Sequence, residues 1–258
     1  MSTLVPHKLE LRDYWSAIKN SHAVLLRRPL AFGSVATMLF LMFLMASAHA
    51  AVLAIIGIAL PILMFVTAEL TSKADNSEPI RWGGITNVLS NGLWYLWWYL
   101  GVMSIASGIA LTVGVALSRA LIPGWWEYFG VSADVSVPSF EDIPEKAIAM
   151  IVVLSVVFGF TFKYIDKFLL RTKKRLNRWE VFAATVDSDS VNLHKGAAMQ
   201  AMLFGVAVLL QVYVGWPASV YLGLVFPAYT YFVYKATYDG SNELFPEKRT
   251  ATVVVSTT

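Results

Sequence analysis

The sequence predicts an all-α integral membrane protein with six transmembrane helices. Of its 258 residues, 57% are hydrophobic and only 14% are charged, whereas soluble domains carry about 25% charged residues. The apolar residues gather in segments that approach the ~20 residues needed to cross ~30 Å of hydrocarbon. The basic residues gather between those segments, mostly on one side. Since so few charges cannot coat a water-exposed surface, lipid is the expected surrounding.

The apolar segments give six predicted spans, with turns at His49-Ala50 and at Gly215-Trp216-Pro217. They are Leu30–Ala48, Ala51–Leu70, Leu93–Leu117, Ala147–Phe162, Ala197–Val214 and Pro217–Tyr234. The first two form one apolar run that would be about 60 Å long as a single helix, so the chain must fold back near His49. The rival interpretation is four spans and a hairpin that does not cross.

Charge placement orients these spans in the membrane. Eighteen of the 20 basic residues fall on one predicted side, and only Arg119 and Lys146 fall on the other. Because basic residues are retained in the cytoplasm, both termini are expected there. Ala46-Ser47-Ala48 resembles a signal-peptide cleavage site, but the long polar segment before it and the apolar span after it disfavour cleavage.

The two ends of the chain resemble each other within one membrane domain, 1–258. Residues 56–61 match 222–227 in a Gly-x-x-x-Pro pattern, and Trp15 and Trp179 keep nearly the same offset. This pattern predicts a parallel repeat with the middle hairpin inserted; the alternative is chance recurrence of Leu, Gly and Pro in apolar helices. The predicted segments are an amphipathic helix 8–28, hairpin 30–70, middle hairpin 93–162 with external loop 118–146, basic cytoplasmic segment 163–196, hairpin 197–234 and cytoplasmic tail 235–258.

One resemblance to a known group of proteins rests on the N-terminal motifs. Trp15, Arg27-Arg28-Pro29-Leu30 and then Gly57 and Pro61 near the end of an apolar hairpin resemble small polytopic bacterial inner-membrane proteins of unknown function. The likeness covers about the first ninety residues. It implies a helical fold embedded in a bacterial inner membrane and carries over no catalytic residue.

The N-terminal helix and the basic residues are the candidate surfaces for lipid. One helical face holds Leu11, Tyr14, Trp15, Ile18, His22 and Leu25, which predicts a helix lying at the membrane interface. Cations beside a membrane attract anionic head groups, or act only as topology determinants. The candidates are Arg27, Arg28, Arg171, Lys173, Lys174, Arg175 and Arg178. No nucleic-acid-binding motif accompanies them, so nucleic acid is not an expected partner.

Two further sets of residues bear on helix packing. Ser104, Gly108, Thr112 and Ala116 recur at spacing four, and such small residues let helices approach closely, within the monomer or across a homo-oligomer. Gly57, Pro61, Gly223 and Pro227 lie inside spans. They are either packed kinks or the frame of a pathway, because each proline frees a carbonyl.

The chemistry of the chain is restricted. Without cysteine there is no disulfide, thiolate or iron–sulfur site. A loop holding Asp187, Asp189 and His194 is expected before the fifth span, but its spacing matches no metal site. No charged residue occupies the middle of a span, where ion-coupled carriers place one. We therefore expect no enzyme activity, cofactor or metal.

The sequence favours a non-enzymatic scaffold or accessory subunit of a membrane complex. Its expected partners are anionic lipids and either a second copy or a larger complex. The alternative is a small-molecule transporter or channel with a pathway between the two repeats.

Overall fold

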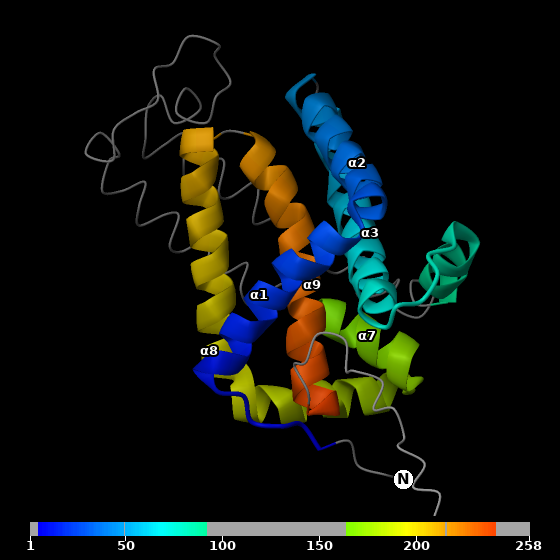
Figure 1. Cartoon of the computed structure of the whole chain (residues 1–258), viewed down its shortest axis with the longest axis vertical. Helices are drawn as coiled ribbons and strands as arrows, with labels where there is room; N and C mark the ends of the chain where they lie inside the picture. The colour runs from blue at the N-terminus through cyan, green and yellow to red at the C-terminus, as the bar shows by residue number, and fades with distance from the viewer. Residues whose placement is uncertain (1–4, 49, 92–163, 215, 241–258) are drawn as a thin grey trace, which may run out of the picture.

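The computed structural model describes residues 5–48, 50–91, 164–214 and 216–240, and every regular element there is α-helical (Figure 1). The predicted all-α class is therefore confirmed. The helices are α1 (Leu11–Arg27), α2 (Pro29–Ala48), α3 (Ala50–Asp75), a helical stretch over 82–91, α7 (Tyr164–Lys174), α8 (Arg178–Val214) and α9 (Trp216–Asp239).

The two middle spans, Leu93–Leu117 and Ala147–Phe162, lie outside the described residues. So do the external loop 118–146, nearly all of the tail 235–258 after Gly240, and the packing stripe of Ser104, Gly108, Thr112 and Ala116. The structure ends and begins helices close to the predicted turns of the outer hairpins, but Ala50, Trp216 and Pro217, which we expected in the turns, are helical. Helix α2 ends at Ala48 and α3 begins at Ala50, while α8 ends at Val214 and α9 begins at Trp216.

Helices α1 and α2 meet at a sharp bend of 100°. Arg28 occupies the break, with a φ of −130° and a ψ of 58°, and Pro29 follows it. A proline disfavours helical geometry in the residue before it and is well suited to the first turn of a new helix. The dipeptide Arg28-Pro29 therefore both ends α1 and starts α2 in a new direction.

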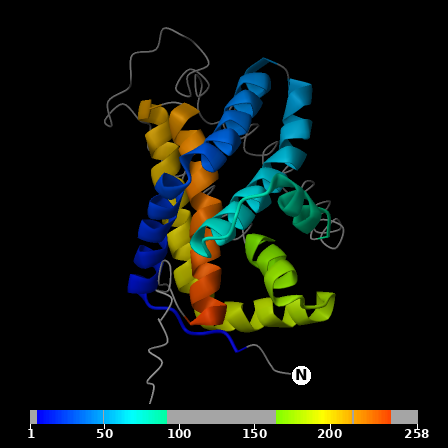
Figure 2. The same ribbon diagram turned by 45° about the vertical axis from the view of Figure 1, so that its right-hand side comes forward.

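Helix α9 forms the centre of the molecule and contacts α1, α2, α3, α7 and α8 (Figures 1 and 2). Its Tyr229 and Phe232 are fully buried. Beside it, Phe65 of α3 stacks on Phe168 of α7 with ring centroids 4.6 Å apart. Apolar burial of side chains this large, at about 25 cal/mol per Å², is what holds the described helices together.

The amphipathic N-terminal helix packs on the protein as well as presenting an outer face. Its buried residues are Tyr14, Ala17, Ser21 and Val24, which lie one above another at helical spacing and pack into the core that α9 centres. Leu11 and Trp15, which we expected on the same apolar face as Tyr14, are exposed. The expected helix is present over Leu11–Arg27, but the face that packs on the protein is that of Tyr14, Ala17, Ser21 and Val24 and differs from the predicted apolar stripe.

The predicted loop around Asp187, Asp189 and His194 is wrong, because all three residues lie within α8. The helix begins earlier than we expected. The Asn177 side-chain oxygen accepts hydrogen bonds from the backbone amides of Trp179 and Glu180, both at 3.0 Å. The backbone amide of Asn177 in turn donates to the Glu180 carboxylate at 2.7 Å. This reciprocal cap starts a helix of 37 residues. Its first part crosses one end of the molecule and its second part runs beside α9 (Figure 2).

Hydrogen bonds join the segment before α1 to the interior of α8 and to the C-terminal end of α9. The His7 amide donates to the Thr237 carbonyl at 2.8 Å. Asn192 of α8 accepts from the Leu9 amide and donates to the His7 carbonyl, both at 2.9 Å. These bonds join residues more than 180 positions apart and hold the extended chain across the bundle.

Among the described residues, no helix taken alone is both long and apolar enough to span a membrane. Helix α1 together with Pro29–Met42 of α2 satisfies length and composition, as a pair bent by 100°.

Candidate functional site

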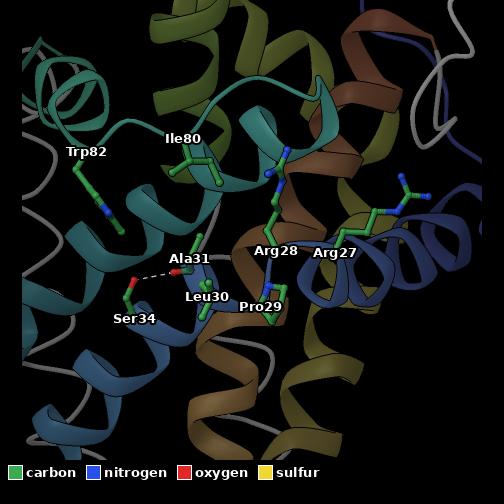
Figure 3. Close-up of a pocket in the computed structure, with 8 residues that line it drawn as sticks. All are labelled: Arg27, Arg28, Pro29, Leu30, Ala31, Ser34, Ile80 and Trp82. Atoms are coloured by element: carbon green, nitrogen blue, oxygen red, sulfur yellow. Dashed lines mark hydrogen bonds between the residues drawn. The ribbon is translucent and has the colours of Figure 1, made fainter.

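An open pocket of about 480 Å³ lies at the bend between α1 and α2, and we call it the elbow pocket (Figure 3). It is lined by Arg27, Arg28, Pro29, Leu30, Ala31, Ser34, Ile80 and Trp82. The first six come from the bend itself. Ile80 and Trp82 come from the segment that follows α3 and face the bend from the other side.

The lining of the elbow pocket combines positive charge with apolar surface. Arg27 and Arg28 are exposed, and no acidic side chain is among the described residues that line the pocket. Trp82 is about half exposed at its rim. The Ser34 hydroxyl is turned back to the Ala31 carbonyl at 2.7 Å, so the guanidinium groups are its main polar feature. Such a lining suits an anionic group attached to an apolar body.

A second feature is a set of ion pairs where α3, α7 and α9 converge. Asp75 Oδ2 lies 2.8 Å from Lys235 Nζ and accepts a hydrogen bond from the Tyr231 hydroxyl at 2.9 Å. Glu69 Oε2 lies 2.7 Å from Lys173 Nζ. Both carboxylates are almost completely buried. Buried charges persist only when paired, so these contacts fix how the three helices meet.

Sequence reasoning missed this cluster. One sequence feature could have indicated it: Glu69 lies at the end of an apolar span and Asp75 follows that span, on the side that carries most of the basic residues. Acids placed there have lysines within reach once the helices assemble. The pattern did not say which lysine each acid would meet, because the partners are about 100 or more positions away.

Among the predicted head-group cations, Arg171, Lys173 and Lys174 make side-chain contacts within the molecule. Lys173 pairs with Glu69, Lys174 pairs with Asp239, and Arg171 donates to the Leu176 carbonyl at 2.7 Å. Arg175 and Arg178 are exposed at the turn between α7 and α8. Arg27 and Arg28 line the elbow pocket.

The predicted kink or pathway residues differ in their surroundings. A Cβ atom added at Gly223 would lie 2.7 Å from Leu39 Cδ1 of α2, so α2 and α9 pack closely there. Pro227 is buried within α9. Gly57 and Pro61 lie in the continuous helical backbone of α3. Gly223 therefore allows α9 to pack closely on α2.

No group of three His, Asp or Glu side chains suited to a metal occurs within the described residues. No protein-family model, curated protein or solved structure matches this chain.

Proposed function

We propose that this chain is a polytopic membrane protein, with six spans and both termini in the cytoplasm, that acts as a non-enzymatic scaffold or accessory subunit of a membrane complex. The observation that carries the membrane location is the outer face of α2. This 20-residue helix has no charged side chain, yet Leu30, Met38 and Leu41 are 91%, 52% and 51% exposed. Such a surface is costly in water and unremarkable in lipid.

The positions of the helix ends support the parallel repeat. Helix α3 ends at Asp75 and α9 ends at Asp239, and the offset of 164 equals that between Trp15 and Trp179. Each unit consists of an amphipathic helical segment, a change of direction, an apolar helix, a short break and a second apolar helix. On this proposal the two units share one orientation in the membrane.

The pairing of the buried carboxylates with lysines favours a scaffold over a carrier. Glu69 and Asp75 are each paired with a lysine at the ends of their helices. Carriers instead keep ionisable groups along a water-accessible path. At Gly223, where the alternative needs a pathway between the repeats, the Leu39 side chain occupies the space. These contacts stabilise one arrangement of the helices.

The first part of α8 supplies a surface for association. Trp179, Phe182 and Val186 are exposed at helical spacing, and they form an apolar stripe next to the cations Arg175 and Arg178. A stripe of this kind lies at a membrane interface or against another subunit. This surface is where the proposal places contact with lipid head groups or with a partner.

Membrane location and orientation are tested by cysteine labelling, because the chain has no native cysteine. In spheroplasts, Ser136→Cys should react with a membrane-impermeant maleimide. Ser190→Cys, on exposed α8 surface, should react only after permeabilisation. The protein should also stay in the membrane pellet after alkaline carbonate extraction. Recovery of the untreated protein in the soluble fraction, or labelling of both cysteines from the same side, would overturn the proposal.

The scaffold and the transporter differ in what surrounds α9. Cysteines placed one at a time from Tyr221 to Thr230 should be unreactive to small charged maleimides on the faces that meet α2 and α3. The full chain, extracted in mild detergent, should migrate as a defined complex larger than one chain. A reactive stripe along α9 in a monomeric protein would favour the transporter.

A further inference from the structure

We propose that the elbow pocket is a binding site for one anionic phospholipid, with its phosphate at Arg27 and Arg28 and an acyl chain lying along the outer face of α2. This inference rests on the membrane location proposed above. It replaces diffuse attraction between cations and the membrane with one defined site.

The charge of the pocket selects the head group. Two adjacent arginines line it, together with Trp82 and apolar atoms, and no acidic side chain is among its described lining residues. A guanidinium binds phosphate oxygens in a planar, two-pronged geometry. A tryptophan ring prefers the head-group level, where one edge is wet and the other is apolar. Zwitterionic lipids bring a second, positive charge that two arginines disfavour.

The exposed face of α2 continues from the pocket and suits an acyl chain. Leu30 lines the pocket, and the exposed positions Gly33, Thr37 and Leu41 follow it at one-turn intervals. The Thr37 hydroxyl donates to the Gly33 carbonyl at 2.9 Å, so its polar group is satisfied within the helix. From Leu30 to Leu41 the helix rises about 16 Å, which is close to the length of an extended acyl chain.

Gly33 gives this face a notch. Nothing lies within 4 Å of a Cβ atom added there, so neither packing nor backbone geometry demands glycine. Glycine costs a helix up to about 1 kcal/mol relative to alanine. An acyl chain seated against the backbone at this position would account for a residue that the helix itself disfavours.

The geometry also explains why these two arginines differ from the other predicted head-group cations. Arg171, Lys173 and Lys174 lie on α7 and do not line the elbow pocket. Arg175 and Arg178 are exposed but do not line the elbow pocket. The bend at Arg28-Pro29 brings two arginines, Trp82 and the exposed apolar face of α2 together around one pocket.

The test is lipid retention by the full chain in mild detergent, measured by native mass spectrometry with added phosphatidylglycerol or phosphatidylcholine. We expect one phosphatidylglycerol per chain to be retained in preference to phosphatidylcholine. Arg28→Gln should weaken retention about fivefold, and Arg27→Gln/Arg28→Gln about twentyfold. The control Lys8→Gln/Lys19→Gln removes the same charge from exposed positions that do not line the elbow pocket, and should change retention less than twofold.

Gly33 separates a lipid from a free anion. Gly33→Leu leaves the charge intact but fills the notch, and should weaken phosphatidylglycerol retention severalfold, whereas Gly33→Ala should have a smaller effect. Millimolar inorganic phosphate should not displace the lipid. Equal retention of the two lipids, equal losses in both double variants, or full displacement by inorganic phosphate would overturn the site. Carbonate extraction of the same variants should be unchanged, so loss of this site is distinguishable from loss of the membrane location.

Discussion

Lys235 of α9 lies with its ammonium nitrogen 2.8 Å from Asp75 Oδ2 at the end of α3, joining residues 160 positions apart. The Asp75 side chain is completely buried, and Tyr231 donates a second hydrogen bond to the same oxygen. At the position related to Asp75 by the offset of 164, Asp239 forms an exposed pair with Lys174 of α7. The two pairs offer a matched comparison of a buried and an exposed contact.

We expect Asp75→Asn to destabilise the protein by about 3–5 kcal/mol, because it leaves the Lys235 charge buried without its counter-ion. Asp239→Asn should cost no more than about 1 kcal/mol, since its pair is exposed and screened by solvent. Unfolding of the purified full chain in mild detergent measures both. The double variant Asp75→Asn/Lys235→Met should recover much of the loss. Equal effects of the two single variants would contradict the buried pair.

Close contact between α2 and α9 at Gly223 gives a second expectation. Gly223→Ala would place a methyl group 2.7 Å from Leu39 Cδ1, so Leu39 must move, at a cost of about 1–3 kcal/mol. The cost should shrink in a Leu39→Ala background, because the clash is removed.

Gly33→Ala is the matched control for this change. Open space surrounds its added methyl group, so the substitution should be neutral or stabilise the helix by up to about 1 kcal/mol. The same unfolding experiment checks both glycines. If Gly223→Ala proves as harmless as Gly33→Ala, the helices do not pack as described.

The sequence predicted some elements of the fold better than others. The two outer hairpins, with α2 separate from α3 and α8 separate from α9, followed from apolar length and turn residues, since these are local properties. The start of α8 was also readable, because Asn177 and Glu180 form a capping pattern, but the acidic residues after it suggested a loop. The capping pattern therefore indicated where the helix begins, but the acidic composition of the following residues was given more weight.

The sequence did not predict which face of α1 is buried or which residues form the ion pairs. A helical pattern says which residues share a face, but not whether lipid or another helix covers it, and both prefer apolar groups. Tyr14 and Trp15 looked equivalent, yet one is buried and the other exposed because α9 packs against only one side. The bend at Arg28-Pro29 was visible as a dipeptide, but the pocket also needs Trp82, which the order of the chain does not place there.

The segment before α1 should detach from α8 when the hydrogen bonds of the Asn192 side chain are removed. Asn192 bonds the Leu9 amide and the His7 carbonyl, both at 2.9 Å, so Asn192→Ala leaves two backbone groups without their partner, at a cost of about 1–3 kcal/mol. Hydrogen exchange of a peptide covering residues 5–10 should accelerate at least tenfold.

Ser190→Ala is the control on the same helix. Its exposed hydroxyl bonds only to the Asp187 carbonyl, at 2.7 Å, so exchange in residues 5–10 should be unchanged and stability should stay within about 0.5 kcal/mol. Acceleration in both variants would mean that α8 as a whole, and not Asn192, controls the segment.

Alkaline pH should distinguish the wild-type protein from Tyr14→Phe. Tyr14 of α1 is completely buried, and its hydroxyl finds no hydrogen-bond partner among the described residues. Burial, and then the negative charges of Asp166 and Asp13, raise the pKa of Tyr14 to about 12. At neutral pH, removing an unpaired hydroxyl should leave stability unchanged or raise it by up to about 1 kcal/mol.

The sign of the pH effect follows from linkage. An unfolded tyrosine ionises near pH 10, while the folded one stays neutral up to about pH 12. Between these values the unfolded state binds fewer protons than the folded state, so the wild type loses stability as pH rises. Tyr14→Phe lacks this loss, and its advantage in unfolding midpoint should widen from pH 10 toward pH 12. Taking the difference between the two proteins cancels the other tyrosines. A gap that stays constant over this range would show that the Tyr14 hydroxyl is in contact with water.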